Sequence, residues 1–321
     1  MTRKLIIFGN GLGMALDSDH FLLSRALEKV WSLDDFLTDE QKGLIKACLD
    51  TDECPRDEEQ LDILHQVASH CNSLEALGRG CCGWLNKHGA EFPIVTGKFI
   101  HKTAIELYNF DGALPDHFAM PLSEFIKSTK SHVATLNYDK LLYESFISTE
   151  VLKNYDSALI DGMLGRGFEA ENLNRKYGKD FGYYMHLHGS PLFFDEDSKT
   201  VKARLGSLNL AMENYGPHIV LTHVKHKRSA ILNSNVLTAY WHQLQLALHE
   251  ATEVILFGYS GQDIHLNKTI QPHVIEGGKH VRVVEWSGAE EERDRVAYWH
   301  EILGGKATLL RLDRVLDFTD W

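Results

Sequence analysis

Short apolar runs that each end in glycine or a polar residue are the feature that most constrains the fold of this 321-residue chain. Such runs are typical of strands that are buried on both faces. Helical patterns separate several of them, and this alternation favours a parallel, doubly wound α/β sheet. The expected strands cover residues 4–8, 132–136, 181–189, 253–257, 280–285 and 307–310. We also expect helices at 141–147, 235–251 and 289–302, a hairpin within 192–203, and a strand at 218–222.

The segment from residue 18 to residue 130 has a different pattern. Apolar residues recur there at helical spacing, and no convincing strand is present. Four prolines mark breaks between the expected helices: Pro55, Pro93, Pro115 and Pro121. We therefore predict a Rossmann-like sheet domain formed by residues 1–17 and 131–321, with residues 18–130 as a helical insertion.

Charge and cysteine content narrow the class of protein. A hydrophobic fraction of 44% is ordinary for a globular chain, and the net charge of −12 argues against direct binding to nucleic acid or a membrane surface. The apolar run after Met1 is too short for a signal peptide or a membrane span, so we expect a cytoplasmic protein. The five cysteines form no C-x-x-C pair and all lie at or before Cys82, and an odd number in a chain of this length argues against a disulfide framework.

Polar residues follow four of the expected strands. Ligands of open α/β sheets bind beyond the carboxyl ends of the strands, so we expect these four exits to converge on one pocket. The first exit, Gly9-Asn10-Gly11, fits G-x-G, but Met14 stands where a dinucleotide fingerprint has its third glycine. Glycines there would let backbone N–H groups approach a diphosphate, although a plain strand-to-helix turn fits equally well. The other exits are Asn137-Tyr138-Asp139, His188-Gly189 and Gly258-Tyr259-Ser260.

Several single residues at these exits have both a functional and a structural interpretation. Asn137 could hold a water or a ribose hydroxyl, and Asn137 or Asp139 could instead shape a turn or cap the next helix. His186 and His188 alternate along one strand and should face opposite sides, so one of them is a sheet histidine. We favour His188, at the strand end, as a base acting on a sugar hydroxyl. Glu285 is placed like the acidic residue that binds ribose hydroxyls in dinucleotide folds, with helix capping as the alternative.

Taken in order, these motifs resemble those of the sirtuin fold family, in its divergent bacterial branch associated with antiphage defence. The resemblance covers residues 4–14 and about 132–290, and it says little about residues 18–130. The matching segments are Gly9 to Gly13 for the first glycine loop, Thr135 to Asp139 with Leu142 and Glu144 for T-x-N-[IY]-D, Leu187-His188-Gly189 for L-H-G, and Phe257 to Asp263 for the G-[TY]-S loop with a downstream Asp.

The resemblance implies NAD as the substrate and cleavage of its nicotinamide–ribose bond as the reaction. It implies that His188 is the general base on the ribose, that Asn137 positions the ribose or the attacking water, and that Asp139 contacts the nicotinamide amide. The remaining implied cofactor-binding residues are Gly9, Asn10 and Gly11 at the phosphates, and Gly258 and Ser260 toward the adenosine side.

One departure from the family affects the expected reaction. Protein-deacylating sirtuins carry a four-cysteine zinc ribbon after the L-H-G histidine, and no cysteine follows His188 here, so we expect no zinc. Water then becomes the natural acceptor of the ADP-ribosyl group, and we predict an NAD glycohydrolase that acts in antiphage defence through NAD depletion.

We expect gating of this activity by homo-oligomeric assembly or by a partner, for which the resemblance implies a HerA-type ATPase. The alternatives are a non-catalytic subunit that senses NAD or ADP-ribose and, with less support, an NAD-dependent protein deacylase.

Overall fold

The predicted parallel α/β sheet is confirmed. The computed structural model describes residues 2–78, 83–164, 167–197, 199–203, 208, 212, 215–221, 227, 230–288, 291–305 and 307–321. Its central sheet is Rossmann-like and has seven strands in the order β11-β10-β9-β1-β2-β6-β3, with every neighbouring pair parallel. The strands are β1 (Leu5–Phe8), β2 (His132–Thr135), β3 (Leu159–Ile160), β6 (Gly182–His186), β9 (Glu253–Phe257), β10 (His280–Trp286) and β11 (Ala307–Leu312).

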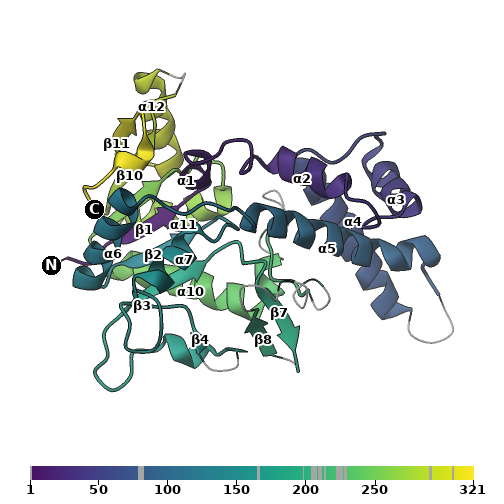
Figure 1. Cartoon of the computed structure of the whole chain (residues 1–321), viewed down its shortest axis with the longest axis horizontal. Helices are drawn as coiled ribbons and strands as arrows, with labels where there is room; N and C mark the ends of the chain where they lie inside the picture. Colours follow the sequence, from purple (N-terminus) through teal and green to yellow (C-terminus); the bar gives the residue numbers. More distant parts are fainter. Residues whose placement is uncertain are drawn as a thin grey trace.

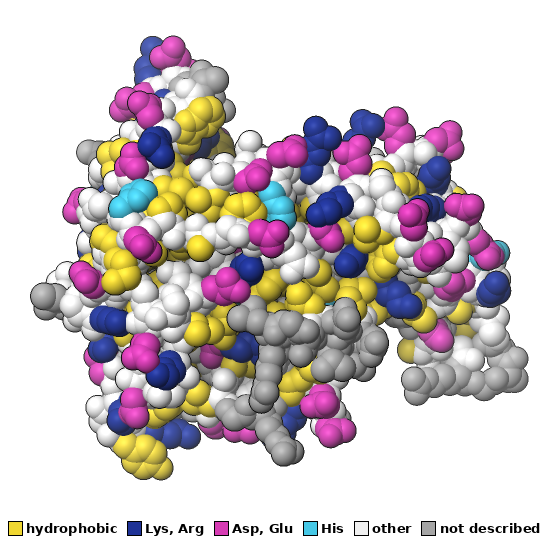
Figure 2. All heavy atoms as spheres, viewed as in Figure 1, with side chains coloured by type: hydrophobic (Ala, Val, Ile, Leu, Met, Phe, Trp, Pro, Cys, Tyr) yellow, Lys and Arg dark blue, Asp and Glu magenta, His cyan; other side chains and the backbone are white. Residues whose placement is uncertain are grey.

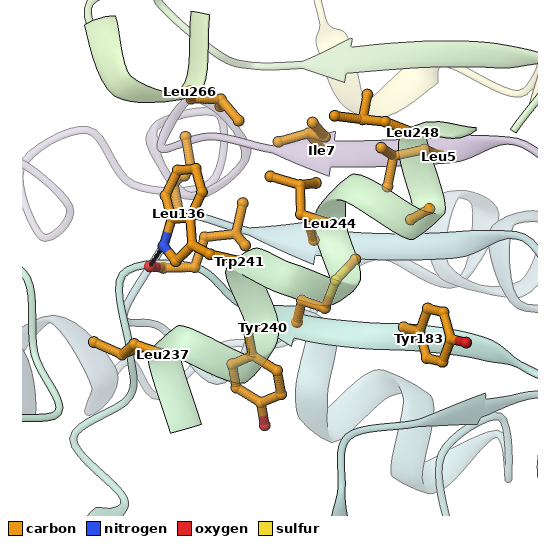
Figure 3. Close-up of a cluster of buried hydrophobic side chains, with 14 of the residues drawn as sticks. Leu5, Ile7, Leu136, Tyr183, Leu237, Tyr240, Trp241, Leu244, Leu248 and Leu266 are labelled. Carbon is orange, nitrogen blue, oxygen red and sulfur yellow. Dashed lines mark hydrogen bonds between the residues drawn. The ribbon is translucent and has the colours of Figure 1, made fainter. Parts of the chain in front are cut away.

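Helices cover both faces of this sheet. Residues Leu5 and Ile7 of β1 face one hydrophobic core, and Ile6 and Phe8 face another, as the two-residue period of a strand requires. In Figure 3, side chains of α10 (Asn235–Glu250) pack against Leu5 and Ile7, and the Trp241 indole N–H donates to the Leu187 carbonyl oxygen at 2.9 Å. The first core also includes residues of α11 (Ile264–Ile275) and α12 (Glu292–Leu303), and the second includes residues of α6 (Asp116–Thr129), α7 (Leu141–Ser148) and η2 (Val315–Asp317).

Four helices form a separate unit that we call the helical arm. It consists of α2 (Leu23–Trp31), α3 (Asp39–Leu49), α4 (Glu58–Leu77) and α5 (Lys87–Tyr108). The arm has its own hydrophobic core and extends away from the sheet in Figure 1. Side chains of Thr38, Asp57 and Asn86 cap three of these helices at the N-terminus, as expected for these residue types.

The arm joins the sheet at the exit of β2. Tyr138 lies in the core of the arm and donates its hydroxyl hydrogen to the Val220 carbonyl oxygen at 2.7 Å. The described part of the predicted insertion contains helices and no strand. However, its last helix, α6, packs on the sheet through Phe118 and Leu122, so the arm is shorter than residues 18–130.

Smaller elements follow the prediction in part. The expected hairpin is present as β7 (Phe193–Glu196) and β8 (Lys199–Lys202). In place of the expected strand at 218–222, Ile219 makes an isolated bridge to Gly189, and Thr222 lies outside the described residues. Residues 289–290 of the last expected helix also lie outside the described residues. The prediction missed β3, α11, the short helices α1 (Gly11–Met14) and η1 (Ala170–Leu173), and the pair β4 (Met163–Leu164) and β5 (Gly167–Phe168). Among the described residues, no helix has the length and apolar character needed to cross a bilayer.

Candidate functional site

The four predicted strand exits lie at one edge of the sheet. Strands β9, β1, β2 and β6 are consecutive and parallel, so their carboxyl ends are neighbours. Two hydrogen bonds join three of the exits directly. The Asn137 amide donates from Nδ2 to the Gly9 carbonyl oxygen at 3.0 Å, and the Gly11 N–H donates to the Gly258 carbonyl oxygen at 2.8 Å. The topology therefore brings these residues together as expected.

The glycines at these exits have a packing role of their own. A Cβ on Gly9 or Gly11 would lie 2.7 Å from the carbonyl oxygen of Gly258, closer than real Cβ atoms come to other atoms. Gly258 itself has φ of +60° and faces the Gly11 backbone. The crossing of the β1 and β9 exits thus requires glycine whether or not a phosphate binds there. Helix α1, which follows, has only four residues and offers little of a helix dipole.

His188 forms a buried cluster with Asp263 and Lys227. His188 follows β6, Asp263 is the N-cap of α11, and Lys227 belongs to the segment before α10. His188 Nε2 lies 2.8 Å from Asp263 Oδ2, Lys227 Nζ lies 2.9 Å from the same oxygen, and Nζ and Nε2 are 3.3 Å apart. The three residues are 8%, 7% and 4% exposed, so their charges interact with little screening by solvent.

The electrostatics of this cluster favour a neutral imidazole beside a carboxylate. Burial lowers the pKa of His188, and the nearby Lys227 ammonium lowers it further. Burial alone would raise the pKa of Asp263, but the hydrogen bond to His188 and the charge of Lys227 hold it well below its usual range. The short contact to Asp263 assigns the ring hydrogen to Nε2, which leaves the lone pair on Nδ1. No described residue hydrogen-bonds to Nδ1, so this nitrogen can act as a base.

Asn137 and Asp139 each present a buried oxygen that lacks a partner. Within the described part of the chain, nothing hydrogen-bonds to Asn137 Oδ1 or Asp139 Oδ2. Buried polar atoms are almost always paired, so two such atoms beside the strand exits indicate a place for water or a ligand. The other carboxylate oxygen of Asp139 accepts the Leu141 N–H at 3.0 Å and holds the start of α7. Burial raises the pKa of Asp139 to about 6.

We predict that Asp139→Asn stabilises the protein in a pH-dependent way. The pKa of Asp139 is about 6 in the fold and about 4 in an unfolded chain, so ionisation costs stability. This cost is absent below about pH 4 and complete above about pH 6, where two pKa units correspond to about 2–3 kcal/mol. The variant should therefore gain about 2–3 kcal/mol in its free energy of unfolding at pH 8 and little at pH 4.

Urea denaturation at both pH values measures this gain. Asparagine keeps the oxygen that accepts from the Leu141 N–H, so the change removes only the charge. Asp52→Asn, at an exposed loop position, is the control and should change stability at neither pH. Equal effects of Asp139→Asn at pH 4 and pH 8 would contradict the assignment of a raised pKa.

His186 lies in a different environment from His188. Its ring centroid is 4.9 Å from that of Tyr184 and 5.4 Å from that of Phe193. Burial lowers the pKa of His186 to about 3, so this imidazole stays neutral. Of the two histidines, His188 is the one that contacts an acidic side chain at the strand exits, while His186 packs among aromatic rings.

The other predicted ligand-binding side chains lie at the margin of the cluster. Asn10 donates from Nδ2 to the Phe21 carbonyl oxygen at 3.0 Å, and Ser260 is exposed. Glu285 accepts hydrogen bonds from Arg295 at 2.7 and 3.0 Å and from the Trp299 indole at 3.1 Å. Because these contacts already engage both carboxylate oxygens, we leave Glu285 out of the candidate site.

The sequence predicts no role for Lys227, and Asp263 enters only as the downstream Asp of the G-[TY]-S segment. Asp263 had a usable signal, because an Asp between a glycine-rich loop and an apolar run is a common N-cap, and its Oδ1 accepts the His265 and Leu266 N–H groups. Lys227 had none, since it reaches the cluster through tertiary folding alone. No group of three or more His, Cys, Asp or Glu side chains suited to a metal ion occurs among the described residues.

A pocket of about 420 Å³ opens nearby, where the segment after α1 meets the helical arm. Asp17, which lines it, donates its N–H to the Gly13 carbonyl oxygen and so connects the pocket to the glycine loop. Two cations at its wall are already paired, Arg25 with Glu28 at 3.1 Å and Lys29 with Glu106 at 2.7 Å. His188 and Asp263 do not line this pocket, so the base and the pocket are separate features.

Comparisons with protein-family models and with curated proteins find no match to this chain. The resemblance to sirtuins therefore rests on the motifs and on their position at the strand exits.

Proposed function

We propose that this protein is an NAD glycohydrolase that cleaves NAD to nicotinamide and ADP-ribose. The observation that supports this most strongly is the His188–Asp263 pair at the shared edge of the parallel sheet. A buried neutral imidazole oriented by a carboxylate can take a proton from a ribose hydroxyl or from water. As a further part of the proposal, NAD depletion serves antiphage defence and is gated by assembly or by a HerA-type ATPase.

The neighbouring residues supply complementary roles. Departure of nicotinamide leaves a positively charged ribose, which a held water captures. The unpaired Oδ1 of Asn137 would accept a hydrogen bond from that water or from a ribose hydroxyl. The unpaired Oδ2 of Asp139, which is ionised above its raised pKa of about 6, would accept a hydrogen bond from the amide N–H of nicotinamide. Fixed dipoles and charges of this kind usually contribute most to catalysis.

Two features favour this function over its alternatives. A deacylase of the sirtuin type would carry cysteines after the catalytic histidine, and this chain has none after Cys82. A sensing subunit would have no need for the His188–Asp263 pair, and buried charges are costly to keep. The presence of this pair at the strand exits supports turnover over binding alone.

Incubation of the purified protein with NAD tests the proposal. We expect nicotinamide and ADP-ribose in equal amounts by liquid chromatography, and no acetyl loss from an added acetylated peptide. The assay is run with and without a HerA-type ATPase, because gating would hold the isolated protein inactive. Tight NAD binding without nicotinamide release in either condition would favour the sensing subunit, and acetyl loss would favour the deacylase.

A further inference from the structure

Lys227 differs from the lysines of the protein surface. In Figure 2, Lys and Arg side chains reach the surface among acidic ones, as is usual for charged residues. Lys227 is instead only 4% exposed, and its Nζ lies 2.9 Å from Asp263 Oδ2 and 3.3 Å from His188 Nε2. A buried ion pair seldom stabilises a fold more than apolar side chains of similar size would. Stability alone therefore does not account for this lysine.

The Asp263 carboxylate is held through both of its oxygens. Oδ1 accepts the N–H groups of His265 and Leu266 in the first turn of α11. Oδ2 accepts from His188 Nε2 at 2.8 Å and from Lys227 Nζ at 2.9 Å. These donors fix the carboxylate, which in turn fixes the imidazole with its hydrogen on Nε2. An ammonium can only donate, so Lys227 shares the carboxylate and leaves the lone pair on Nδ1 unused.

The charge of Lys227 opposes protonation of His188. When Nδ1 takes a proton, the ring becomes an imidazolium, which the ammonium 3.3 Å from Nε2 repels. The Asp263 carboxylate acts in the opposite direction, and so does Glu58 at the start of α4. The Tyr138 ring, with its centroid 6.5 Å from that of His188, is uncharged because burial raises its pKa well above the usual value. Burial and then the ammonium lower the pKa of His188.

We propose that Lys227 is a positioning residue for the base of this site. It shares Asp263 with His188, holds the ring in one orientation and keeps it uncharged, so that Nδ1 can take a proton even in mildly acidic solution. Without Lys227, the carboxylate would favour the imidazolium, and the base would be lost at a higher pH. The inference rests on the proposed function, because turnover is what uses the base.

The pH dependence of NAD cleavage tests this role. It is measured under the condition that gives nicotinamide release, with or without a HerA-type ATPase. The base works above its pKa, so a raised pKa removes activity on the acidic side only. Lys227→Met should therefore move the acid limb of kcat/KM up by about one pH unit or more. Lys227→Gln, which keeps a donor for Asp263 without the charge, should do the same, whereas Lys227→Arg keeps the charge and should keep the wild-type limb.

Lys202→Met is the matched control. Lys202 Nζ also pairs with a buried aspartate, Asp161, at 2.6 Å. Its charge lowers the pKa of His186 and does not contribute to that of His188. Removing Lys202 should therefore leave the acid limb where it is, even if the rate falls at every pH.

An NMR titration separates this inference from the proposed function. The ring C–H signals of His188, assigned by their loss in His188→Ala, report the charge of the ring without turnover. We expect the pKa of His188 to rise by about one pH unit or more in Lys227→Met and in Lys227→Gln. The Asp263 carboxylate keeps its other donors in both variants, so the fold should persist.

Three results would overturn the inference. They are an unchanged pKa of His188 in Lys227→Met and Lys227→Gln, a loss of activity that is equal at every pH, and an equal shift of the acid limb in Lys227→Arg or Lys202→Met. A raised pKa without nicotinamide release from any variant would instead overturn the proposed function, and it would leave the effect of Lys227 on the imidazole established.

Discussion

Replacing His188 with alanine is expected to slow nicotinamide release by about 10²- to 10⁴-fold, the usual contribution of a general base. The Asp263–Lys227 ion pair remains in this variant, so the fold should persist. NAD should still bind, because the proposed phosphate and amide contacts come from other residues. Initial rates give the loss of activity, and calorimetric titration with NAD gives the affinity.

The matched control for this variant is His242→Ala. His242 is an exposed histidine on α10, and its replacement should leave the rate unchanged. A loss of less than about tenfold for His188→Ala would show that His188 is not the base. A large loss accompanied by a lower free energy of unfolding would indicate a structural role instead.

Replacing Asp263 with alanine is expected to lower the free energy of unfolding by about 3–5 kcal/mol, the cost of leaving a buried charge without its partner. The Lys227 ammonium would lose the carboxylate 2.9 Å away, with almost no solvent to replace it. The same change removes the N-cap of α11, which contributes about 1 kcal/mol of the total. Chemical denaturation at neutral pH measures the difference.

Two further variants separate the charge from the cap. Asp263→Asn keeps an oxygen for the α11 N–H groups, so its loss should come from the unpaired Lys227 alone. Adding Lys227→Met to Asp263→Ala removes the buried charge and should restore most of the stability. If Asp263→Ala costs less than about 1 kcal/mol, solvent reaches Lys227, and the cluster is more open than its contacts indicate.

The sequence predicts the strands of this fold well because their signal is local. All four residues of β1 are buried, and such runs between helical patterns have few alternative structures. The sequence does not predict helix α11, because Pro272 lies inside it and proline usually ends a helix. The two-residue strand β3 is too short to leave a pattern.

The residues of the candidate site likewise differ in whether a local sequence pattern predicts them. Asn137 and His188 were identified because the topology of a parallel sheet fixes where strand exits meet. Lys227 was not, because it contacts residues 36 and 39 positions away through a segment without a recognisable pattern. The contacts of Glu285 with Arg295 and Trp299 likewise depend on the packing of α12 against β10, which strand position alone does not specify.

The position of β1 in the middle of the sheet also sets the order in which the protein is assembled during synthesis. Leu5 pairs with His132 and Val254, residues that follow it by 127 and 249 positions (132 − 5 and 254 − 5). At roughly 5–20 residues per second, the ribosome needs about 12–50 seconds after making Leu5 to reach Val254. During that interval the wholly apolar strand β1 has an open edge, so chaperones are expected to bind the nascent chain there. Variants that delay this closure would lower the yield of folded protein in cells while leaving its final stability unchanged.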